Sequence, residues 1–211
     1  MKIATARQAR RPYRQSARAE AAEATGRRIL DAFQDAMRDN WLEDITLDQV
    51  ARVAGVTVQT LIRRFGGKDG LLRAVCEHME RDVLRRRETP VGDLKCAVAN
   101  LCVDYEASGD MIVRILAQES RFPNLTPLLD FGRERHRHWI SQIAAPWLQA
   151  LPSARQQSAI DTLVTALDVY VWKLVRRDMG RSREETGRVM LRLAAGARDQ
   201  ISQDSLTGET P

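Results

Sequence analysis

The sequence lacks the features that place a protein in a membrane, outside the cell or around a metal ion. Its 211 residues contain no apolar run near the roughly 18–20 residues of a membrane-spanning helix. The basic N-terminus has no apolar stretch of the kind found in secretion signals. Cys76, Cys96 and Cys102 are odd in number and have no C-x-x-C spacing, which argues against a disulfide framework and a zinc site. We therefore expect a cytoplasmic protein with reduced thiols, no cofactor and no membrane partner.

Residues for catalysis are also scarce. The chain has three histidines, and the G-x-S-x-G, H-E-x-x-H and P-loop motifs are absent. His136 and His138 are two positions apart, so on a helix their side chains point about 200° apart and cannot hold one metal ion. We expect no metal site, and an all-α enzyme is the weakest of the functional alternatives.

Strand signals are missing as well. Valine and isoleucine never alternate over a strand-length run, and there are no hairpin dipeptides. Apolar residues instead recur every three or four positions, as on one face of a helix, and at 44% hydrophobic residues the chain can bury a core. The sequence predicts an all-α fold of about nine helices, at residues 16–40, 47–54, 58–65, 68–88, 93–107, 110–120, 127–151, 153–177 and 182–202.

The net charge of +5 is concentrated at the N-terminus. Residues 1–28 contain eight lysines and arginines and two glutamates, a net charge of +6, so the remainder carries −1. A basic arm without an apolar face favours nucleic acid over membrane as its partner. Pro12 favours an extended backbone, so Arg10, Arg11 and Arg14 suit a minor groove, and we expect disorder without DNA. The alternative is a tail that only improves solubility.

A helix-turn-helix is predicted directly after the first helix. Thr46 and Gln49 have the spacing of a capping box at the start of residues 47–54, and Gly55 can end that helix. Thr57 can cap residues 58–65, which Gly66 would end. Two short helices joined by a tight turn form a helix-turn-helix. The alternative is a helical hairpin within a larger core, with its arginines in solvent.

The second of these short helices has a face suited to reading DNA. Burying Leu61 and Phe65 turns Val58, Gln59, Ile62 and Arg63 outward. Glutamine can bind adenine, arginine can bind guanine with two hydrogen bonds, and valine can contact the thymine methyl group. Hydroxyl groups near a helix start suit a phosphate.

The residues also carry a family resemblance. The pattern TLxxVAxxAGVTxxTLxxxFxxKxxLL over residues 46–72 resembles the DNA-binding domain of the tetracycline-repressor (TetR) family, and the similarity covers about residues 27–75. It implies a homodimeric transcriptional regulator, usually a repressor, which a small molecule releases from a double-stranded DNA operator. By position, the resemblance implies phosphate contacts from Thr46, Thr57, Thr60 and Lys68, and base contacts from Val58, Gln59 and Arg63.

The chain departs from the family pattern in ways that change the expected DNA contacts. Ile62 stands where the family often has tyrosine, and Arg63 and Arg64 replace a common aromatic–histidine pair. More of the DNA contact should therefore be ionic. We expect a basic arm at residues 1–16, a DNA-binding domain at 17–67, an effector-binding and dimerisation domain at 68–202 and a loose tail at 203–211.

The last two predicted helices, at residues 153–177 and 182–202, each carry a stripe of apolar residues, which predicts a dimer interface. These two helices can pair with their copies in a four-helix bundle. A dimer suits a helix-turn-helix protein because two DNA-reading helices must reach successive turns of DNA. The alternative is that the stripes only close the core of one chain. The predicted interface residues are Leu163, Leu167, Val171, Met190, Leu193 and Ala197.

The middle helices contain most of the large aromatic residues. Aromatic side chains with polar tips suit a site that orients an apolar or amphipathic ligand. Each of them is also a natural core residue, which leaves a DNA-binding regulator without an effector as the alternative. The predicted effector-binding residues are Cys102, Tyr105, Met111, Ile112, Ile115, Trp139, Trp147 and Trp172.

Overall fold

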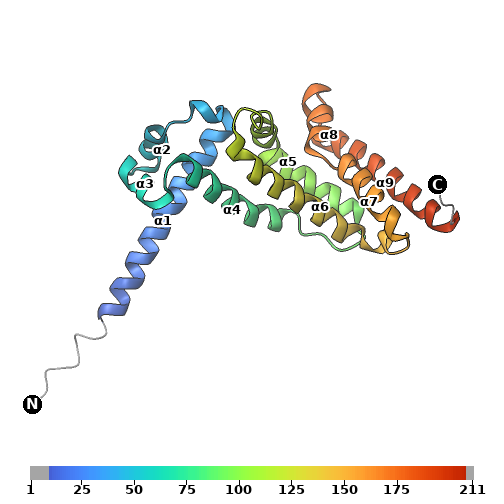
Figure 1. Cartoon of the computed structure of the whole chain (residues 1–211), viewed down its shortest axis with the longest axis horizontal. Helices are drawn as coiled ribbons and strands as arrows, with labels where there is room; N and C mark the ends of the chain where they lie inside the picture. The colour runs from blue at the N-terminus through green and yellow to red at the C-terminus, as the bar shows by residue number, and fades with distance from the viewer. Residues whose placement is uncertain (1–9, 208–211) are drawn as a thin grey trace, which may run out of the picture. The chain divides into compact units, whose positions relative to one another are not determined.

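The structure, a computed structural model, describes the backbone of residues 10–207 and the side chains of residues 18–203. Within the described backbone every regular element is helical and none is a strand, which confirms the predicted all-α fold (Figure 1). The chain forms two compact units, residues 1–78 and residues 79–211. The division falls inside one helix, between His78 and Met79.

The first unit contains four helical segments of the helix-turn-helix region. These are α1 (Arg10–Asp39), the 3-10 turn η1 (Leu42–Asp44), α2 (Leu47–Ala54) and α3 (Val58–Phe65), followed by the first part of α4 (Lys68–Arg86). Apolar side chains three or four positions apart on α1 close the core of this unit. Its fully buried members are Ile29, Phe33, Leu61, Leu71 and Val75.

Helix α1 begins earlier than predicted, at Arg10 instead of residue 16. The expected extended form of the arm is therefore wrong for the backbone of residues 10–16. Pro12 is the third residue of the helix, where the N–H that proline lacks would have no intrahelical partner. Residues 1–9 and the side chains of Arg10, Arg11 and Arg14 lie outside the described part of the chain.

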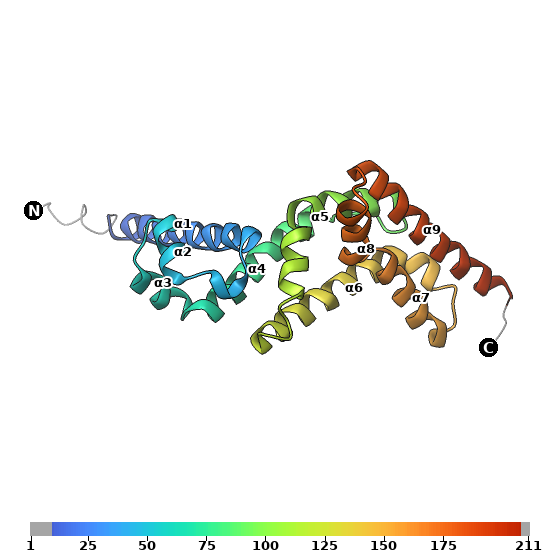
Figure 2. The ribbon, with the colours of Figure 1, turned by 90° about the horizontal axis from the view of Figure 1, so that it is seen from above.

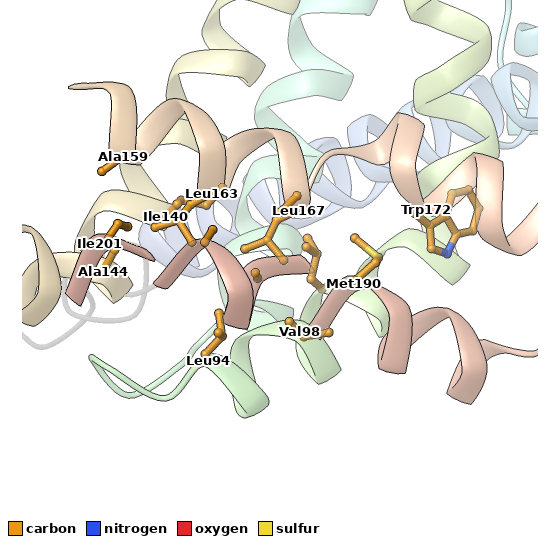
Figure 3. Close-up of a cluster of buried hydrophobic side chains, with 14 of the residues drawn as sticks. Leu94, Val98, Ile140, Ala144, Ala159, Leu163, Leu167, Trp172, Met190 and Ile201 are labelled. Atoms are coloured by element: carbon orange, nitrogen blue, oxygen red, sulfur yellow. The ribbon is translucent and has the colours of Figure 1, made fainter. Parts of the chain in front are cut away.

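The second unit is built on α5 (Leu94–Leu116), against which the later helices pack. The other elements are η2 (Pro123–Leu125), α6 (Thr126–Leu148), α7 (Ser153–Ala166), α8 (Val169–Lys173), the π-helical turn η3 (Leu174–Asp178) and α9 (Arg183–Thr207). Helices α8 and α9 lie beside α5, as Figure 2 shows. Leucine, isoleucine and methionine side chains from α5, α6, α7 and α9 meet in one core, together with Trp172 of α8 (Figure 3).

Helix α5 continues through the break predicted at residues 108–109. The Ser108 hydroxyl donates to the Asp104 carbonyl one turn back, at 2.8 Å, so it stays within the helix. Gly109 has a packing role instead of a helix-ending one. A Cβ atom at this position would lie 2.5 Å from the Trp172 ring, so only glycine lets that ring approach α5 so closely.

The long helix predicted at residues 153–177 is interrupted. Helix α7 ends at Ala166, and Asp168 leaves helical geometry with φ −73° and ψ 152°. Its carboxylate accepts from the Tyr170 N–H at 2.8 Å and so caps α8. Apolar residues keep the three- or four-residue spacing of a helix across the break between α7 and α8, which is why periodicity alone predicted one helix. Helix α6 also ends earlier than predicted, at Leu148.

Candidate functional site

The turn between α2 and α3 has the capping geometry that the sequence predicted. The Thr46 hydroxyl accepts from the Gln49 N–H at 3.2 Å, while the Thr46 N–H donates to Gln49 Oε1 at 2.9 Å. Gly55 ends α2 in the left-handed region at φ 67° and ψ 39°. The Thr57 hydroxyl accepts from the Thr60 N–H at 3.2 Å and so caps α3. These contacts confirm the local structure of the helix-turn-helix.

The predicted orientation of α3 is also confirmed. Leu61 is fully buried, Phe65 and Val58 are half-buried, and Gln59, Ile62 and Arg63 are exposed. Gln59 and Arg63, two of the residues predicted to read bases, thus lie on the solvent face of a short helix whose opposite face is anchored by Leu61, while the third, Val58, is less exposed than predicted.

Arg64 does not share the direction of Arg63. Its guanidinium lies against α1, because a Cβ atom on Gly26 would be 2.4 Å from Arg64 Nη2. The same group lies 5.7 Å above the Phe65 ring. The lone glycine in the alanine-rich part of α1 is the signal that sequence reasoning missed, since it makes room for this side chain.

Lys68 has a structural contact that the sequence did not reveal. Its Nζ donates to the Leu42 carbonyl, which ties the start of α4 to η1. Partial burial lowers the pKa of Lys68, and the nearby carboxylates of Asp44, Asp69 and Glu43 oppose that effect. The helices α3 and α4 also meet closely, because a Cβ atom on Gly70 would lie 1.6 Å from the Phe65 carbonyl oxygen. Gly70 thus fixes the spacing between α3 and α4.

In the second unit the structure brings together most of the predicted effector-binding residues. Cys102, Tyr105 and Trp172 belong to the buried core, and Ile112, Trp139 and Trp147 pack against it. Met111 is buried and Ile115 half-buried, but neither is part of that cluster. Burial raises the pKa of the Cys102 thiol to about 11, so it remains protonated at neutral pH.

A buried ion-pair cluster, which the sequence analysis did not predict, lies beside these aromatic residues. Asp104 of α5 is fully buried and binds two arginines that end or directly follow α4. Arg86 Nε donates to Asp104 Oδ1 and Arg87 Nε to Oδ2, each at 2.7 Å. Arg87 also lies over the Tyr105 ring at 5.3 Å and the Trp139 ring at 5.4 Å.

His136 of α6 completes this cluster as a neutral ring. Its Nδ1 is 2.9 Å from Arg87 Nη1. Burial, and then the positive charge of Arg87, lower the pKa of His136 to about 3. The Trp139 indole N–H donates to the Arg87 carbonyl at 2.9 Å, so α6 binds both the side chain and the backbone of this residue.

Tyr105 lies at the centre of the aromatic group. Its hydroxyl donates to the Leu167 carbonyl at the end of α7, at 3.0 Å, and its ring is 5.8 Å from that of Trp172. Burial raises the pKa of Tyr105, so the hydroxyl remains a donor.

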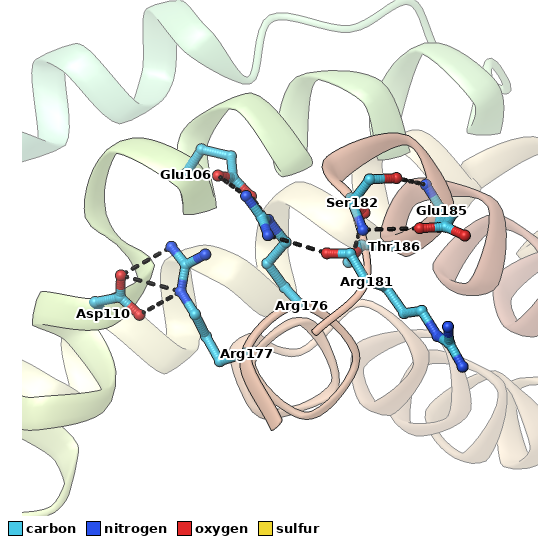
Figure 4. A network of polar contacts seen from close by, with 8 residues as sticks. All are labelled: Glu106, Asp110, Arg176, Arg177, Arg181, Ser182, Glu185 and Thr186. Carbon is cyan, nitrogen blue, oxygen red and sulfur yellow. Dashed lines mark hydrogen bonds and ion pairs between the residues drawn. The ribbon is translucent and has the colours of Figure 1, made fainter. Parts of the chain in front are cut away.

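Two ion pairs fasten the π-helical turn η3 onto α5 (Figure 4). Arg176 donates to both carboxylate oxygens of Glu106, at 2.7 and 3.2 Å, and Arg177 binds Asp110 in the same two-pronged way. The Arg177 guanidinium also lies 4.7 Å from the centre of the Trp172 ring. The two ion pairs therefore fix η3 to α5, and the Arg177 guanidinium covers one face of the buried Trp172 ring.

The predicted dimer-interface residues divide into two groups. Leu163, Leu167, Met190 and Ala197 are buried in the core of the single chain, which leaves them little surface with which to contact a second copy. The alternative, that these stripes close the core, describes them correctly. Val171 is half-buried, whereas Leu193 keeps 48% of its surface exposed.

Neither a membrane-spanning helix nor a cluster of metal-ligating side chains occurs in the described part of the chain. No helix between residues 10 and 207 is long and apolar enough to cross a membrane. In that same part of the chain, no group of three or more histidine, cysteine, aspartate or glutamate residues could hold a metal ion.

Known proteins share both the sequence pattern and the fold. Residues 42–75 match the family model for bacterial regulatory proteins of the tetR family. The chain is 30% identical over 148 residues to the HTH-type transcriptional regulator BetI of Burkholderia mallei (strain NCTC 10229), covering 66% of this chain and 76% of that protein. BetI of Burkholderia thailandensis is 29% identical over 148 residues, with the same coverage.

Two solved structures have the same fold. A transcriptional regulator from Rhodococcus sp. Rha1 aligns with a TM-score of 0.65 at 15% identity, over 83% of this chain and 96% of that one. A putative TetR-family transcriptional regulator from Rhodococcus sp. aligns with a TM-score of 0.63 at 20% identity, over 84% and 98%.

Proposed function

The chain belongs to the tetR family of bacterial regulatory proteins, and on that premise we propose that it binds a palindromic operator as a homodimer and leaves it when a small effector binds. Regulation of transcription through a helix-turn-helix is the function of the family. The dimer, the operator symmetry and the effector are the proposal. Residues 17–67 would form the DNA-binding domain and residues 68–202 the effector-binding and dimerisation domain.

The exposed face of α3 carries the proposal for DNA recognition. Gln59 and Arg63 are exposed while Leu61 anchors the helix from behind. We assign base contacts to Val58, Gln59 and Arg63 because their side chains can complement base edges in the major groove.

The remaining contacts are assigned to phosphates. Thr46, Thr57 and Thr60 lie at helix starts, where hydroxyl groups and N–H groups favour an anion. Lys68 retains two amine protons beyond the one given to Leu42. Arg64, whose guanidinium is held against α1, is assigned to contact with the DNA phosphates and not to base reading.

An operator selected from a randomised DNA pool tests these roles. Arg63→Ala should weaken binding by about 1–3 kcal/mol and relax the preference at one base position, whereas Lys68→Ala should weaken all sequences equally. Arg38→Ala, which removes the same charge from the last turn of α1, is the control. Uniform loss of affinity in both the Arg63 and Lys68 variants would refute the assigned orientation of α3.

For the dimer, the supporting observation is the set of exposed apolar side chains on α8, η3 and α9 and directly after η3. They are Tyr170, Leu174, Met179 and Leu193. Gly196 of α9 has open space where a side chain would stand, so a second helix could approach closely there. A two-fold dimer would let two copies of α3 reach sites about 34–36 Å apart.

For the effector, the supporting observation is the aromatic group around Tyr105. Buried aromatic rings with polar tips are typical of ligand sites in helical domains. A regulator whose interior is simply filled remains the second candidate, because the same side chains form a continuous core. Compounds that raise Tm and also lower operator affinity would support the effector, and operator affinity unchanged by every bound compound would contradict it.

A further inference from the structure

The unpaired polar atoms in the described interior are all of one kind. Among residues 18–203, three buried side-chain nitrogen or oxygen atoms have no hydrogen-bond partner: His136 Nε2, Arg137 Nη2 and Trp172 Nε1. Arginine and tryptophan nitrogens are donors only. Arg137 is set aside because a third of its side chain is exposed and its Nη1 binds Asp161 at 2.6 Å. The other two atoms are buried beside the aromatic core.

The hydrogen on His136 can be placed by its partner. A guanidinium has no acceptor, so Arg87 Nη1 donates to His136 Nδ1 across 2.9 Å. The ring is neutral because its pKa is lowered to about 3, and a neutral imidazole whose Nδ1 accepts carries its hydrogen on Nε2. The Leu167 backbone carbonyl is a hydrogen-bond partner of this ring, where it opposes the lowering of the pKa, so His136 is set aside as well.

Trp172 supplies the donor that remains unpaired. Its side chain is fully buried, with the Arg177 guanidinium on the ring and Gly109 of α5 close by. None of these neighbours offers Nε1 an acceptor within hydrogen-bond distance. A buried donor left unpaired destabilises the folded chain, so a fold that retains one is poised to gain from any group that supplies an acceptor.

The Trp172 donor lies in the aromatic group around Tyr105. The Tyr105 ring is 5.8 Å from the Trp172 ring, and the Arg87 guanidinium lies over the other rings of the group. The Tyr105 hydroxyl offers Trp172 no acceptor within reach, since it donates to the Leu167 carbonyl and Trp172 Nε1 has no partner. The region around Tyr105 thus offers apolar surface and an unpaired N–H group.

We propose that the region around Tyr105, between α5, α6 and α8, binds an apolar molecule carrying a carbonyl or carboxylate oxygen, which accepts the N–H group of Trp172. The inference rests on the proposed function and gives the effector a chemical class. An ammonium-bearing molecule of the same shape would bring more donors to a region that needs acceptors, and beside Arg87 it would also meet a like charge.

The test follows the indole N–H signals of the full chain by NMR with 15N-labelled tryptophan. The chain has four tryptophans, and Trp172→Phe identifies the signal of interest by its disappearance. Octanoate and phenylacetate are the carboxylate probes, methyl phenylacetate is the neutral carbonyl probe, and octylammonium and phenethylammonium are the matched donors. We expect at least one acceptor probe to move the Trp172 signal downfield and neither ammonium probe to move it.

Affinity provides the second measurement. By calorimetry, Trp172→Phe should weaken binding of the active probe about tenfold, the effect of one hydrogen bond, and Trp41→Phe, on the exposed side chain in the first unit, should leave it unchanged. The proposal is overturned if no acceptor probe moves the Trp172 signal, or if the ammonium probes move it equally.

Operator binding, measured in parallel, separates this site from the proposed function. A probe that binds at Trp172 without releasing operator DNA would support the site and contradict effector-controlled release. Release by an ammonium probe that leaves the Trp172 signal in place would support the function and overturn the site.

Discussion

Replacing Asp104 with asparagine would leave two arginines sharing one neutral acceptor inside the second unit. Asp104 is fully buried, and each of its oxygens binds one arginine at 2.7 Å. Removing one partner of a buried pair costs about 3–5 kcal/mol, because the remaining charge stays buried without compensation. Asparagine retains one acceptor oxygen, so we expect the lower end, about 3 kcal/mol, and the upper end for Asp104→Leu.

Thermal unfolding of the second unit measures this loss. For a chain of this length, 3–5 kcal/mol lowers Tm by roughly 6–20 °C. Asp82→Asn is the control, since Asp82 pairs with Arg85 at the surface one turn away and should cost at most about 0.5 kcal/mol. A difference between Asp104→Asn and this control of less than about 1 kcal/mol would refute the buried-charge argument.

A paired substitution tests the same reasoning from the other direction. If the cost comes from the uncompensated charge of Arg87, then Arg87→Met introduced into Asp104→Leu should restore stability toward that of the parent. If the double variant is instead less stable than Asp104→Leu, the loss comes from packing and not from charge.

Three further predictions follow from individual positions. The pKa of His136 is about 6.5 in the unfolded chain and is lowered to about 3 in the folded one, so the free energy of unfolding should fall as pH drops from about 6.5 toward 3, by up to about 1.4 kcal/mol per pH unit. His136→Gln should flatten that slope in acid-unfolding curves, and identical slopes would contradict the prediction. Gly70→Ala should destabilise the first unit by at least about 1–3 kcal/mol because its Cβ meets a backbone oxygen, whereas Gly132→Ala, where the added atom meets open space, should stabilise the chain slightly in urea titrations. Leu193→Glu should convert the dimer to a folded monomer by light scattering, whereas a charge at the buried Leu167 should unfold the chain; a dimer that survives Leu193→Glu removes α9 from the proposed interface.

Local signals in the sequence predicted the helix-turn-helix well. The caps of α2 and α3 depend on residues three positions apart, so Thr46, Gln49 and Thr57 were readable without any knowledge of the fold. Leu61 and Arg63 were placed on opposite faces correctly because helical geometry alone fixes their directions.

Contacts between distant residues were not readable. Arg64 turns toward α1 because Gly26 makes room, and Lys68 donates to Leu42, 26 positions away. Gly109 resembled a helix end, yet its role is set by Trp172, which no local pattern could indicate.

The C-terminal apolar stripes show the same limit. Periodicity finds Leu163 and Met190 but cannot say which chain covers them, and in this structure it is their own. The ion pairs of Asp104 likewise join residues 17 and 18 positions apart, on different helices.

The positions of the tryptophans give the chain a built-in optical reporter. Trp41 is the one tryptophan within residues 1–78, and 45% of its side chain is exposed, whereas Trp172 is fully buried and Trp139 and Trp147 are half-buried. An indole in water emits at longer wavelength than one in an apolar interior. Loss of packing in the second unit should therefore move the fluorescence to the red, while melting of the helix-turn-helix alone should leave the emission colour nearly unchanged. Compared with circular dichroism, which follows every helix, this signal would separate the melting of the two units without any attached dye.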